Sequence, residues 1–475
     1  MADSMGLYID GKWIKKDTTY PLYSPYNGQF IANISAADEQ DVQRAIEGAH
    51  QAFLTFRERP AYERANILAA VVEQLKARKE ELVEVLVKET GKPIRLARTE
   101  LERTINTYQF SAEEAKRLYG ETIPMDAASG GEDRLGMTWR EPIGVVVAIT
   151  PFNFPFNLVA HKVGPAIAVG NTVVLKPAEQ TPLSALKIAE IFAEAGLPAG
   201  ALQVVTGSGE KLGDALIQHD LVKKVTFTGS VPVGKQIKAK AGLKKTTLEL
   251  GSNSGLIIEA DVPLDKIIPR CVEGAFSFSG QVCISLQRIY VQQAIYEEFS
   301  QKFIAKTNQL RIGDPFREET DISSMIHPRE TERALKWVNN AVQAGAKVGC
   351  GGKVEKGIFL PTVLLGGDQR LEVVCKEVFA PIVTIIPYQT LDEAIAYVND
   401  SNYGLNAAIY TMDINKAFYA AKRLEAGGVI INDIPTFRVD HMPYGGVKES
   451  GYGREGVKYA IRDMTELKLV TIKRL

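Results

Sequence analysis

Three side chains that lie far apart in the sequence could act together on a carbonyl group. Cys283 ends the stretch FSFSGQVC, Glu249 closes the stretch TTLE, and Asn153 stands in PFNFP. A thiol can attack a carbonyl carbon, a carboxylate can act as a general base, and an amide N–H can stabilise the oxyanion that forms. Any one of the four cysteines could instead be a buried structural residue, because free cysteine packs as a small hydrophobic side chain. The combination favours chemistry through a covalent intermediate on Cys283.

The segments that must position these side chains alternate between strand and helix patterns. Buried strands are predicted at residues 145–149, 172–175, 202–205 and 224–227, with helices at 184–195 and 212–218. This alternation predicts an α/β fold with a parallel, doubly wound sheet. Further segments are predicted as helices at 38–119, a second α/β section at 254–431, and two strands at 134–140 and 467–472. The last of these strands has no local partner in the sequence.

Composition limits the classes to which this chain can belong. The 475 residues suit two or three domains, and 45% hydrophobic and 24% charged residues are ordinary for a globular protein. A formal net charge of −1 gives no general attraction to nucleic acid or to an anionic membrane. No run approaches the roughly 18 apolar residues of a membrane span, and residues 1–6 lack a signal-peptide pattern. The cysteines form no CxxC pair and the histidines no HExxH motif, so we expect a cytoplasmic protein without a metal site.

Two glycine-bearing turns follow predicted strands, where a parallel sheet binds its ligands. The first, Gly207-Ser208-Gly209, does not have the GxGxxG spacing of a dinucleotide fingerprint. The second runs from Gly229 to Lys235 and spells GxxxxGK, but Gln236 follows where a P-loop has serine or threonine. A nucleotide triphosphatase is therefore an alternative, and a plain strand-to-helix turn is another. Backbone N–H groups at such a helix start would favour a phosphate in either case.

The chain resembles the NAD(P)-dependent aldehyde dehydrogenase superfamily from about Tyr8 to its C-terminus. The motifs that carry the resemblance are PFNFP, KPAE, FTGS, ELG, GQVC, EVFAP and PYGGVKESGYGRE, in this order. The resemblance implies a Rossmann-like cofactor domain, a second α/β catalytic domain and a small β arm for oligomerisation. It places the cofactor domain at 1–119 and 142–248, the catalytic domain at 249–445, and the arm at 120–141 and 446–475. A homodimer or homotetramer is expected.

The resemblance also implies roles for the three side chains. Cys283 is expected to form a thiohemiacetal and then a thioester, with Asn153 and its own backbone N–H stabilising the oxyanion. Glu249 is expected to activate the water that releases a free acid, because family members that transfer the acyl group to coenzyme A usually lack this glutamate. Lys162 matches a position near the site that supports the hydrogen-bond network, although it could be a surface lysine. A binding or structural protein that has kept the fold but lost catalysis is the alternative of another class. The presence of Cys283, Glu249 and Asn153 together argues against it.

NAD is the expected cofactor. By resemblance, Lys176 and Glu179 face the adenosine ribose, Ser230 contacts the pyrophosphate, and Glu377 and Phe379 hold the nicotinamide ribose. A carboxylate at Glu179 would accept a hydrogen bond from a 2′-hydroxyl and repel a 2′-phosphate, which favours NAD over NADP. The complete set of expected cofactor contacts is Thr150, Pro151, Phe152, Lys176, Glu179, Gly209, Phe227, Gly229, Ser230, Leu250, Glu377 and Phe379.

The substrate is expected to be a small 2-hydroxyaldehyde. The sequence as a whole is similar to the sequences of lactaldehyde dehydrogenases and of their relatives acting on sulfolactaldehyde. Arg103 and Arg438 stand near the positions where non-phosphorylating glyceraldehyde-3-phosphate dehydrogenases of the family hold a phosphate, although each could be a surface ion pair. Val282 and His161 are the other expected substrate contacts. We therefore expect a lactaldehyde-like substrate with a possible anionic group at C3, with succinate semialdehyde and betaine aldehyde as rival substrates.

Overall fold

An eight-stranded sheet forms the base of the first domain in the computed structural model, which describes residues 5–474. Its strands follow the order β2-β1-β9-β8-β7-β10-β11-β23, and the five strands from β9 to β11 are mutually parallel. The four buried strands predicted in this part of the chain are confirmed. The bounds are β1 Leu7–Ile9, β2 Lys12–Ile14, β7 Val145–Ile149, β8 Thr172–Lys176, β9 Leu202–Val204, β10 Val222–Thr228, β11 Lys245–Glu249 and β23 Gly451–Tyr452.

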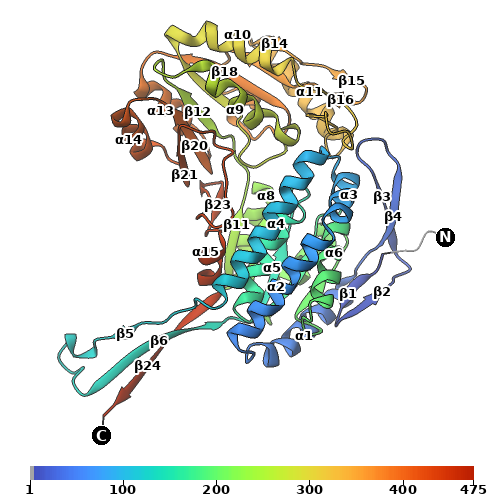
Figure 1. Cartoon of the computed structure of the whole chain (residues 1–475), viewed down its shortest axis with the longest axis vertical. Helices are drawn as coiled ribbons and strands as arrows, with labels where there is room; N and C mark the ends of the chain where they lie inside the picture. The colour runs from blue at the N-terminus through green and yellow to red at the C-terminus, as the bar shows by residue number, and fades with distance from the viewer. Residues whose placement is uncertain (1–4, 475) are drawn as a thin grey trace.

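Helices cover both faces of this sheet, as a doubly wound fold requires. Helices α2 to α6 bury their apolar residues against one face, and α1, α7 and α8 pack on the other. Figure 1 shows helices α2 to α6, in blue and green, in front of the sheet. The bounds are α1 Glu39–Phe56, α2 Ala61–Ala77, α3 Lys79–Thr90, α4 Ile94–Glu114, α5 Asn157–Ala168, α6 Pro182–Glu194, α7 Gly209–Gln218 and α8 Val231–Lys240.

The second α/β domain begins directly after β11. Its seven strands follow the order β14-β17-β18-β13-β12-β20-β21, and all but β14 are parallel to their neighbours. Its elements are β12 Gly255–Ile258, α9 Leu264–Phe276, β13 Arg288–Gln292, α10 Tyr296–Thr307, α11 Pro328–Gln343, β14 Lys347–Cys350, β17 Thr362–Leu365, α12 Glu372–Cys375, β18 Ile382–Tyr388, α13 Leu391–Asn399, β20 Asn406–Tyr410, α14 Ile414–Arg423 and β21 Gly428–Ile431. The chain thus passes from one domain to the other immediately beyond Glu249.

The arm is a three-stranded sheet of β5 (Thr122–Ile123), β6 (Arg134–Pro142) and β24 (Thr465–Lys473) that projects from the body (Figure 1). The C-terminal strand has no partner nearby in the sequence, as expected, and the resemblance grouped it with residues 120–141. Strand β24 pairs antiparallel with β6 along its whole length, from Thr465 opposite Pro142 to Lys473 opposite Arg134. The pattern of the sequence alone did not predict the register of this pairing, because the two strands are separated by most of both domains.

The arm is also smaller than the predicted segments. Strand β23 pairs with β11 in the first sheet, and the apolar residues of α15 (Val457–Asp463) join the core of the first domain. Only the chain from Thr465 onward belongs to the arm at this end. The remaining short elements are β3 Thr19–Tyr23, β4 Phe30–Ser35, η1 Met125–Ala127, η2 Ser277–Gly280, η3 Gln293–Ile295, β15 Val354–Glu355, β16 Ile358–Phe359, β19 Tyr403–Gly404 and β22 Val447–Lys448.

None of the helices within residues 5–474 combines the length and apolar character needed to cross a bilayer.

Candidate active site

The expected cofactor residues meet at the carboxyl ends of adjacent parallel strands. Ile149 at the end of β7 is in register with Lys176 on β8 and with Phe227 on β10. Thr228, the next residue of β10, is in register with Glu249 on β11. Thr150, Pro151 and Phe152 continue from β7 at this edge, and Leu250 continues from β11. The topology therefore brings segments from 149 to 250 to one edge of the sheet, where ligands of parallel sheets bind.

Lys176, Glu179 and Gly209 converge at the start of α7. The backbone N–H of Gly209 donates to the Glu179 carboxylate at 3.2 Å, so Glu179 lies on the helix N-terminus. Lys176 is buried and its Nζ donates to the Pro177 carbonyl at 3.0 Å. A Cβ on Gly209 would stand 3.8 Å from that Nζ, at van der Waals contact, so the helix start lies close against Lys176. The arrangement leaves Glu179 exposed beside the cleft.

The turn after β10 does not have the character of a nucleotide triphosphatase loop. Ser230 is exposed at the N-cap of α8, as a phosphate-binding residue would be. Lys235, which a P-loop would direct at phosphates, instead pairs with Glu449 at 2.6 Å on the surface. A Cβ on Gly229 would meet the Phe227 ring at 2.4 Å, so the glycine allows close packing at this turn. The near match to GxxxxGK is a strand-to-helix turn with a free helix start.

A second wall of the cleft comes from the catalytic domain. Glu377 and Phe379 lie in an irregular segment after α12. The Ser252 backbone N–H donates to the Glu377 carboxylate at 3.0 Å, and burial raises the pKa of Glu377 to about 7. The rings of Phe379 and Phe152 pack edge to face with centroids 5.9 Å apart. The contact between the two rings brings the two domains together across the expected nicotinamide site.

Cys283 lies at the end of a loop with unusual backbone geometry. Phe278, Ser279 and Gly280 all have left-handed backbone angles, with φ of 48°, 54° and 68°. Such angles are costly for residues with a Cβ and are kept where surrounding contacts enforce them. The Ser279 hydroxyl donates to the Ser323 carbonyl at 3.0 Å, and the Gln281 side chain accepts from the Ile326 N–H at 2.9 Å. The loop is therefore held rigidly by the 323–326 segment behind it.

The carboxamide of Asn153 reaches this loop. Its Nδ2 donates to the Gln281 carbonyl at 3.0 Å and lies 4.0 Å from Cys283 Sγ, while its Oδ1 is buried without a partner in the described chain. Burial raises the pKa of the Cys283 thiol to about 12, the charge of Glu377 adds to this effect, and the hydrogen bond from Asn153 opposes it. Cys283 is thus a neutral thiol at neutral pH with an amide donor beside it, and a proton must be removed when the sulfur attacks.

Glu249 is buried at the end of β11, and neither carboxyl oxygen has a hydrogen-bond partner within residues 5–474. Burial raises the pKa of Glu249 well above its usual value, and the nearby charge of Glu455 adds to the shift. A Cβ on Gly445 would stand 2.9 Å from Glu249 Oε1, so a glycine there leaves the carboxyl group room. An unpartnered buried carboxyl group with a raised pKa suits a general base for water.

Lys162 is fully buried rather than at the surface. Its Nζ donates to Glu455 Oε1 at 2.7 Å and to the Thr226 hydroxyl at 3.3 Å. Arg438 Nη2 donates to the other oxygen, Oε2, of Glu455 at 3.1 Å. Burial raises the pKa of Glu455, but the charges of Lys162 and Arg438 dominate and lower it to about 2. Glu455 stood in the sequence motif PYGGVKESGYGRE, yet nothing in the motif indicated that it joins two buried cations.

A cavity of about 380 Å³ opens beside Cys283 between the two domains. Three of the four expected substrate residues line it: Val282, Arg103 and Arg438. Phe154, Leu158, Ile284 and Tyr444 supply apolar wall, and the Arg438 guanidinium lies 3.7 Å above the centroid of the Tyr444 ring. His161 is not among the lining residues, because it is buried behind Arg438. The cavity therefore combines a thiol, an apolar wall and three guanidinium groups, those of Arg103, Arg270 and Arg438.

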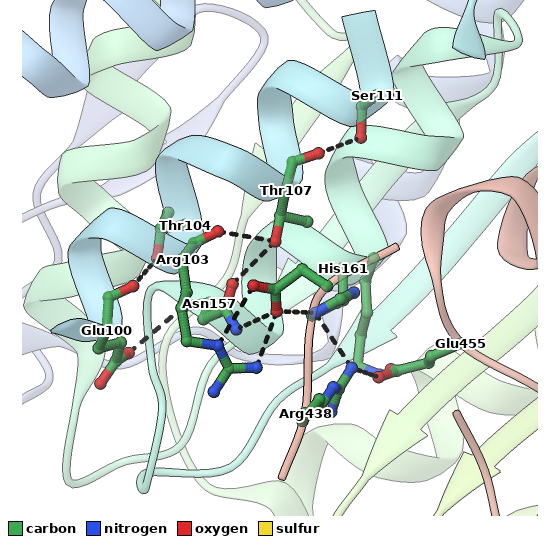
Figure 2. A network of polar contacts seen from close by, with 11 residues as sticks. Glu100, Arg103, Thr104, Thr107, Ser111, Asn157, His161, Arg438 and Glu455 are labelled. Carbon is green, nitrogen blue, oxygen red and sulfur yellow. Dashed lines mark hydrogen bonds and ion pairs between the residues drawn. The ribbon is translucent and has the colours of Figure 1, made fainter. Parts of the chain in front are cut away.

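Asp440 joins these residues into one network. It forms two hydrogen bonds with Arg103, at 2.8 and 3.2 Å, and accepts from Asn157 Nδ2 at 3.0 Å. His161 Nε2 lies 3.0 Å from both Asp440 Oδ1 and Arg438 Nη2. Figure 2 shows Arg103, Asn157, His161 and Arg438 pointing toward one another from α4, α5 and the C-terminal loop. Asp440 had no predicted role, because only the fold brings it close to the two arginines.

The network leaves Arg438 short of acceptors. Burial raises the pKa of Asp440, but its bonds with His161 and Arg103 lower it below the usual range, so the group is a carboxylate. A neutral imidazole nitrogen can either donate or accept, and facing a carboxylate Nε2 donates. The Arg438 N–H directed at His161 then has no acceptor, and Arg438 Nε is buried with no partner in the described chain. The Nε–H of this cavity-lining arginine is left for another acceptor.

The described residues hold no group of three or more His, Cys, Asp or Glu side chains that could bind a metal ion.

Comparison with known sequences adds to this geometry. The sequence model of the aldehyde dehydrogenase family matches residues 13–470. The 3-sulfolactaldehyde dehydrogenase of Priestia aryabhattai is 48% identical over 468 residues, which cover 98% of both chains. The lactaldehyde dehydrogenase of Methanococcus aeolicus is 42% identical over 472 residues, covering 98% of this chain and 99% of the relative.

Solved structures agree with the fold over the full chain. Aldehyde dehydrogenase 21 from Physcomitrella patens, in complex with the reaction product succinate, superposes with a TM-score of 0.97. It is 41% identical and covers 100% of this chain and 99% of its own. The glyceraldehyde-3-phosphate dehydrogenase GapN from Methanocaldococcus jannaschii, complexed with NADP, has a TM-score of 0.93 at 40% identity and covers 97% and 100% of the two chains.

Proposed function

We propose that this chain, which belongs to the aldehyde dehydrogenase family, uses NAD to oxidise a small 2-hydroxyaldehyde that carries an anionic group at C3. The aldehyde that fits best is 3-sulfolactaldehyde, and the product is the free carboxylate. The observation that carries this proposal is Arg438, which lines the cavity beside Cys283 and whose buried Nε–H has no acceptor in the described chain. A sulfonate or phosphate oxygen supplies the acceptor that the protein does not.

Four residues divide the chemistry between them. Cys283 Sγ attacks the aldehyde carbon as its proton passes to solvent water, and the carbonyl oxygen becomes an oxyanion held by Asn153 Nδ2 and the Cys283 backbone N–H. When this adduct loses its hydride, a thioester remains on Cys283. Glu249 takes a proton from water, whose oxygen attacks the thioester and releases the acid and the thiolate. Lys162 holds Glu455, and so the charges around Glu249, in place.

The cofactor cleft suits a dinucleotide, and when bound NAD supplies the hydride acceptor. Exposed Ser230 at the start of α8 offers a free helix N-terminus to a phosphate. Glu179 stands beside Lys176, where a ribose 2′-hydroxyl could donate to it and a 2′-phosphate would be repelled. This charge supports NAD over NADP, although the neighbour GapN was complexed with NADP. The ratio of catalytic efficiencies with the two cofactors tests the preference.

The relatives and the cavity agree on the substrate class. The two relatives are named for lactaldehyde and its C3 sulfonate, which differ by the anion. Charge in the cavity disfavours betaine aldehyde, because Arg103 and Arg438 would repel a quaternary ammonium group. Succinate semialdehyde carries a carboxylate that could use the same arginines, and one structural neighbour was solved with succinate. A panel of aldehydes must therefore separate sulfonate, phosphate, carboxylate and uncharged substrates.

The test compares these aldehydes in two variants, Arg438→Met and Arg103→Met, by following NADH formation. Charge-assisted hydrogen bonds contribute roughly 1.5–3 kcal/mol each, so each variant should lose about 10–100-fold in kcat/KM with 3-sulfolactaldehyde. Propanal, which makes no such contact, should lose less than about threefold. Arg270→Met is the matched control, because Arg270 lines the same cavity but is paired with Asp433 and Glu273.

Three outcomes would count against the proposal. Equal losses with the sulfonate and with propanal would make the arginines structural. No loss with either would make plain lactaldehyde the better substrate. A wild-type preference for succinate semialdehyde over 3-sulfolactaldehyde would move the function to the alternative dehydrogenase activity.

We further propose a homodimer or homotetramer in the cytoplasm. All four cysteines are free, which suits a reducing compartment. The arm presents a sheet edge on β24 that could join another subunit.

A further inference from the structure

Lys92 and Glu100 form an ion pair in the protein interior, and both side chains are completely buried. Lys92 lies between α3 and α4, and Glu100 lies in the second turn of α4. Removing two charges from water is costly, and such a pair is often no more stabilising than apolar side chains of similar volume. Its contacts, rather than its charge alone, therefore indicate its role.

Both members of the pair bind the turn that carries Asn153. Lys92 Nζ donates to the Asn153 main-chain carbonyl at 2.7 Å. Glu100 Oε1 accepts from the backbone N–H groups of Phe156 and Asn157, at 3.0 and 3.3 Å. Figure 2 shows Glu100 beside Asn157. These N–H groups start α5, whose own N-cap residue provides no side-chain bond. Because helix starts have unpaired N–H groups and favour negative charge, Glu100 fixes the place and direction of α5.

Lys92 also reaches the nucleophile loop. Its Nζ lies 4.0 Å from the centroid of the Phe154 ring and 4.5 Å from that of Phe278. Phe154 follows Asn153, and Phe278 has left-handed backbone angles in the loop that leads to Cys283. A cation over two ring faces attracts both. The ammonium group thus packs between the segment with the amide donor and the segment with the thiol.

From these contacts we infer that Lys92 and Glu100 are positioning residues that fix the Asn153 carboxamide against Cys283. Neither needs to touch the substrate, since they act through the 153–157 turn. The inference rests on the oxyanion role of Asn153 in the proposed function. On this inference, a buried ion pair in the wall of the cavity aligns the donor and the nucleophile.

The test replaces both charges at once, in the double variant Lys92→Met/Glu100→Met, so that no lone charge is left buried. We expect kcat with propanal to fall about 10–100-fold, approaching the loss from deleting an oxyanion donor, while KM for NAD changes less than about twofold. Alkylation of Cys283 by iodoacetamide at pH 8 should slow as well. The Asn153 hydrogen bond lowers the thiol pKa, so displacing it leaves less thiolate.

A second ion pair, with a buried lysine and a partly exposed aspartate, provides the control. Lys224 pairs with Asp463 between β10 and α15, away from the cavity. Lys224→Met/Asp463→Met can lower the melting temperature, but it should leave kcat and the alkylation rate within about twofold of wild type. A loss of kcat and of alkylation rate in the Lys92/Glu100 variant alone separates positioning from general stability.

Asn153→Ala separates this inference from the proposed function. If Asn153→Ala keeps its kcat, the oxyanion role fails and the inference falls with it. If Asn153→Ala loses activity but a folded Lys92→Met/Glu100→Met variant keeps both kcat and alkylation rate, only the inference is overturned. Should the double variant not fold, Glu100→Gln keeps an acceptor for Phe156 but removes the charge that holds Lys92. An unchanged kcat and alkylation profile in Glu100→Gln would also overturn the inference.

Discussion

Glu249 and Cys283 share an environment that favours their neutral forms. Burial raises the pKa of both groups, and each lies near other negative charge, Glu455 for the carboxyl and Glu377 for the thiol. A raised pKa makes the Glu249 carboxylate a stronger base toward water. It also makes the Cys283 thiolate, once formed, a stronger nucleophile. The unpartnered oxygens of Glu249 leave room for a water to bind there. The two steps of the reaction should therefore separate when Glu249 alone is changed.

Glu249→Gln should allow the first hydride transfer and then stop at the thioester. Glutamine keeps the size of the side chain but cannot take a proton from water. We expect a burst of about one NADH per active site, followed by a steady rate at least about 100-fold below wild type. Stopped-flow absorbance at 340 nm measures both phases. Equal loss of burst and steady rate would instead place Glu249 in thiol activation.

Glu377 predicts a pH dependence of cofactor binding. Its pKa is raised to about 7 by burial, so the carboxylate that could accept from ribose hydroxyls is lost as the pH falls through 7. KM for NAD should therefore be about 3–10-fold higher at pH 6 than at pH 8. In Glu377→Gln, KM should be high at both pH values. A wild-type KM that does not vary between these pH values would show that Glu377 does not bind the ribose.

Among the elements, the nucleophile loop depends on one close backbone contact. Gly280 has a φ of 68°, and a Cβ there would meet the Ala380 carbonyl oxygen at 2.2 Å. Ala380 follows Phe379 in the segment expected to hold the cofactor. The contact therefore couples the position of Cys283 to the wall of the cofactor cleft.

Gly280→Ala should shift this loop and lower kcat by at least about tenfold, because misplacing a reacting atom by about 1 Å can cost 100-fold. Gly242→Ala is the matched control, since Gly242 has a φ of 58° but nothing within 4 Å of an added Cβ. Both variants carry a similar backbone cost of about 1 kcal/mol, and the close contact with Ala380 should lower thermal stability further in Gly280→Ala alone. Similar kcat values in the two variants would mean that the close contact has no effect on catalysis.

Strands of the first sheet that carry a continuous apolar pattern could be predicted from the sequence, whereas the second domain could be predicted only as an alternating section at 254–431. Residues 145–149 are continuously apolar between turn residues, and they form a central strand of the first sheet. The resemblance grouped 120–141 with 446–475, but the register of β6 with β24 and the packing of α15 against the first domain could not be predicted, because their partners are distant in the chain. The chemical residues Cys283, Glu249 and Asn153 stood out by type and motif. Lys92, Glu100 and Asp440 did not, because only the fold determines which charges are buried and which partners they meet.

At the scale of the whole molecule, two sheets end in open edges. Strand β24 is an edge of the arm sheet, and β21 is an edge of the catalytic domain's sheet. Leu467, Leu469 and Ile472 on β24 each expose half or more of their surface. Beside β21, the helix α14 and the residues before it expose Met412, Ile414 and Phe418. Open edges with apolar side chains favour pairing with another chain, so we expect both to be covered in an oligomer.

A chain ending at Met464 tests this expectation, because it loses β24 but keeps Met464, which is buried in the core of the first domain. Light scattering should then report the mass of one chain, where the full-length protein reports two or four. The domains should stay folded, since β24 pairs only with β6 in the described chain. The double variant Leu467→Ser/Leu469→Ser keeps the strand and its backbone pairing with β6 while removing two exposed apolar side chains. It should weaken assembly by a smaller amount, seen as dissociation on dilution. An unaltered mass after truncation would assign assembly to another surface and leave the arm without this role.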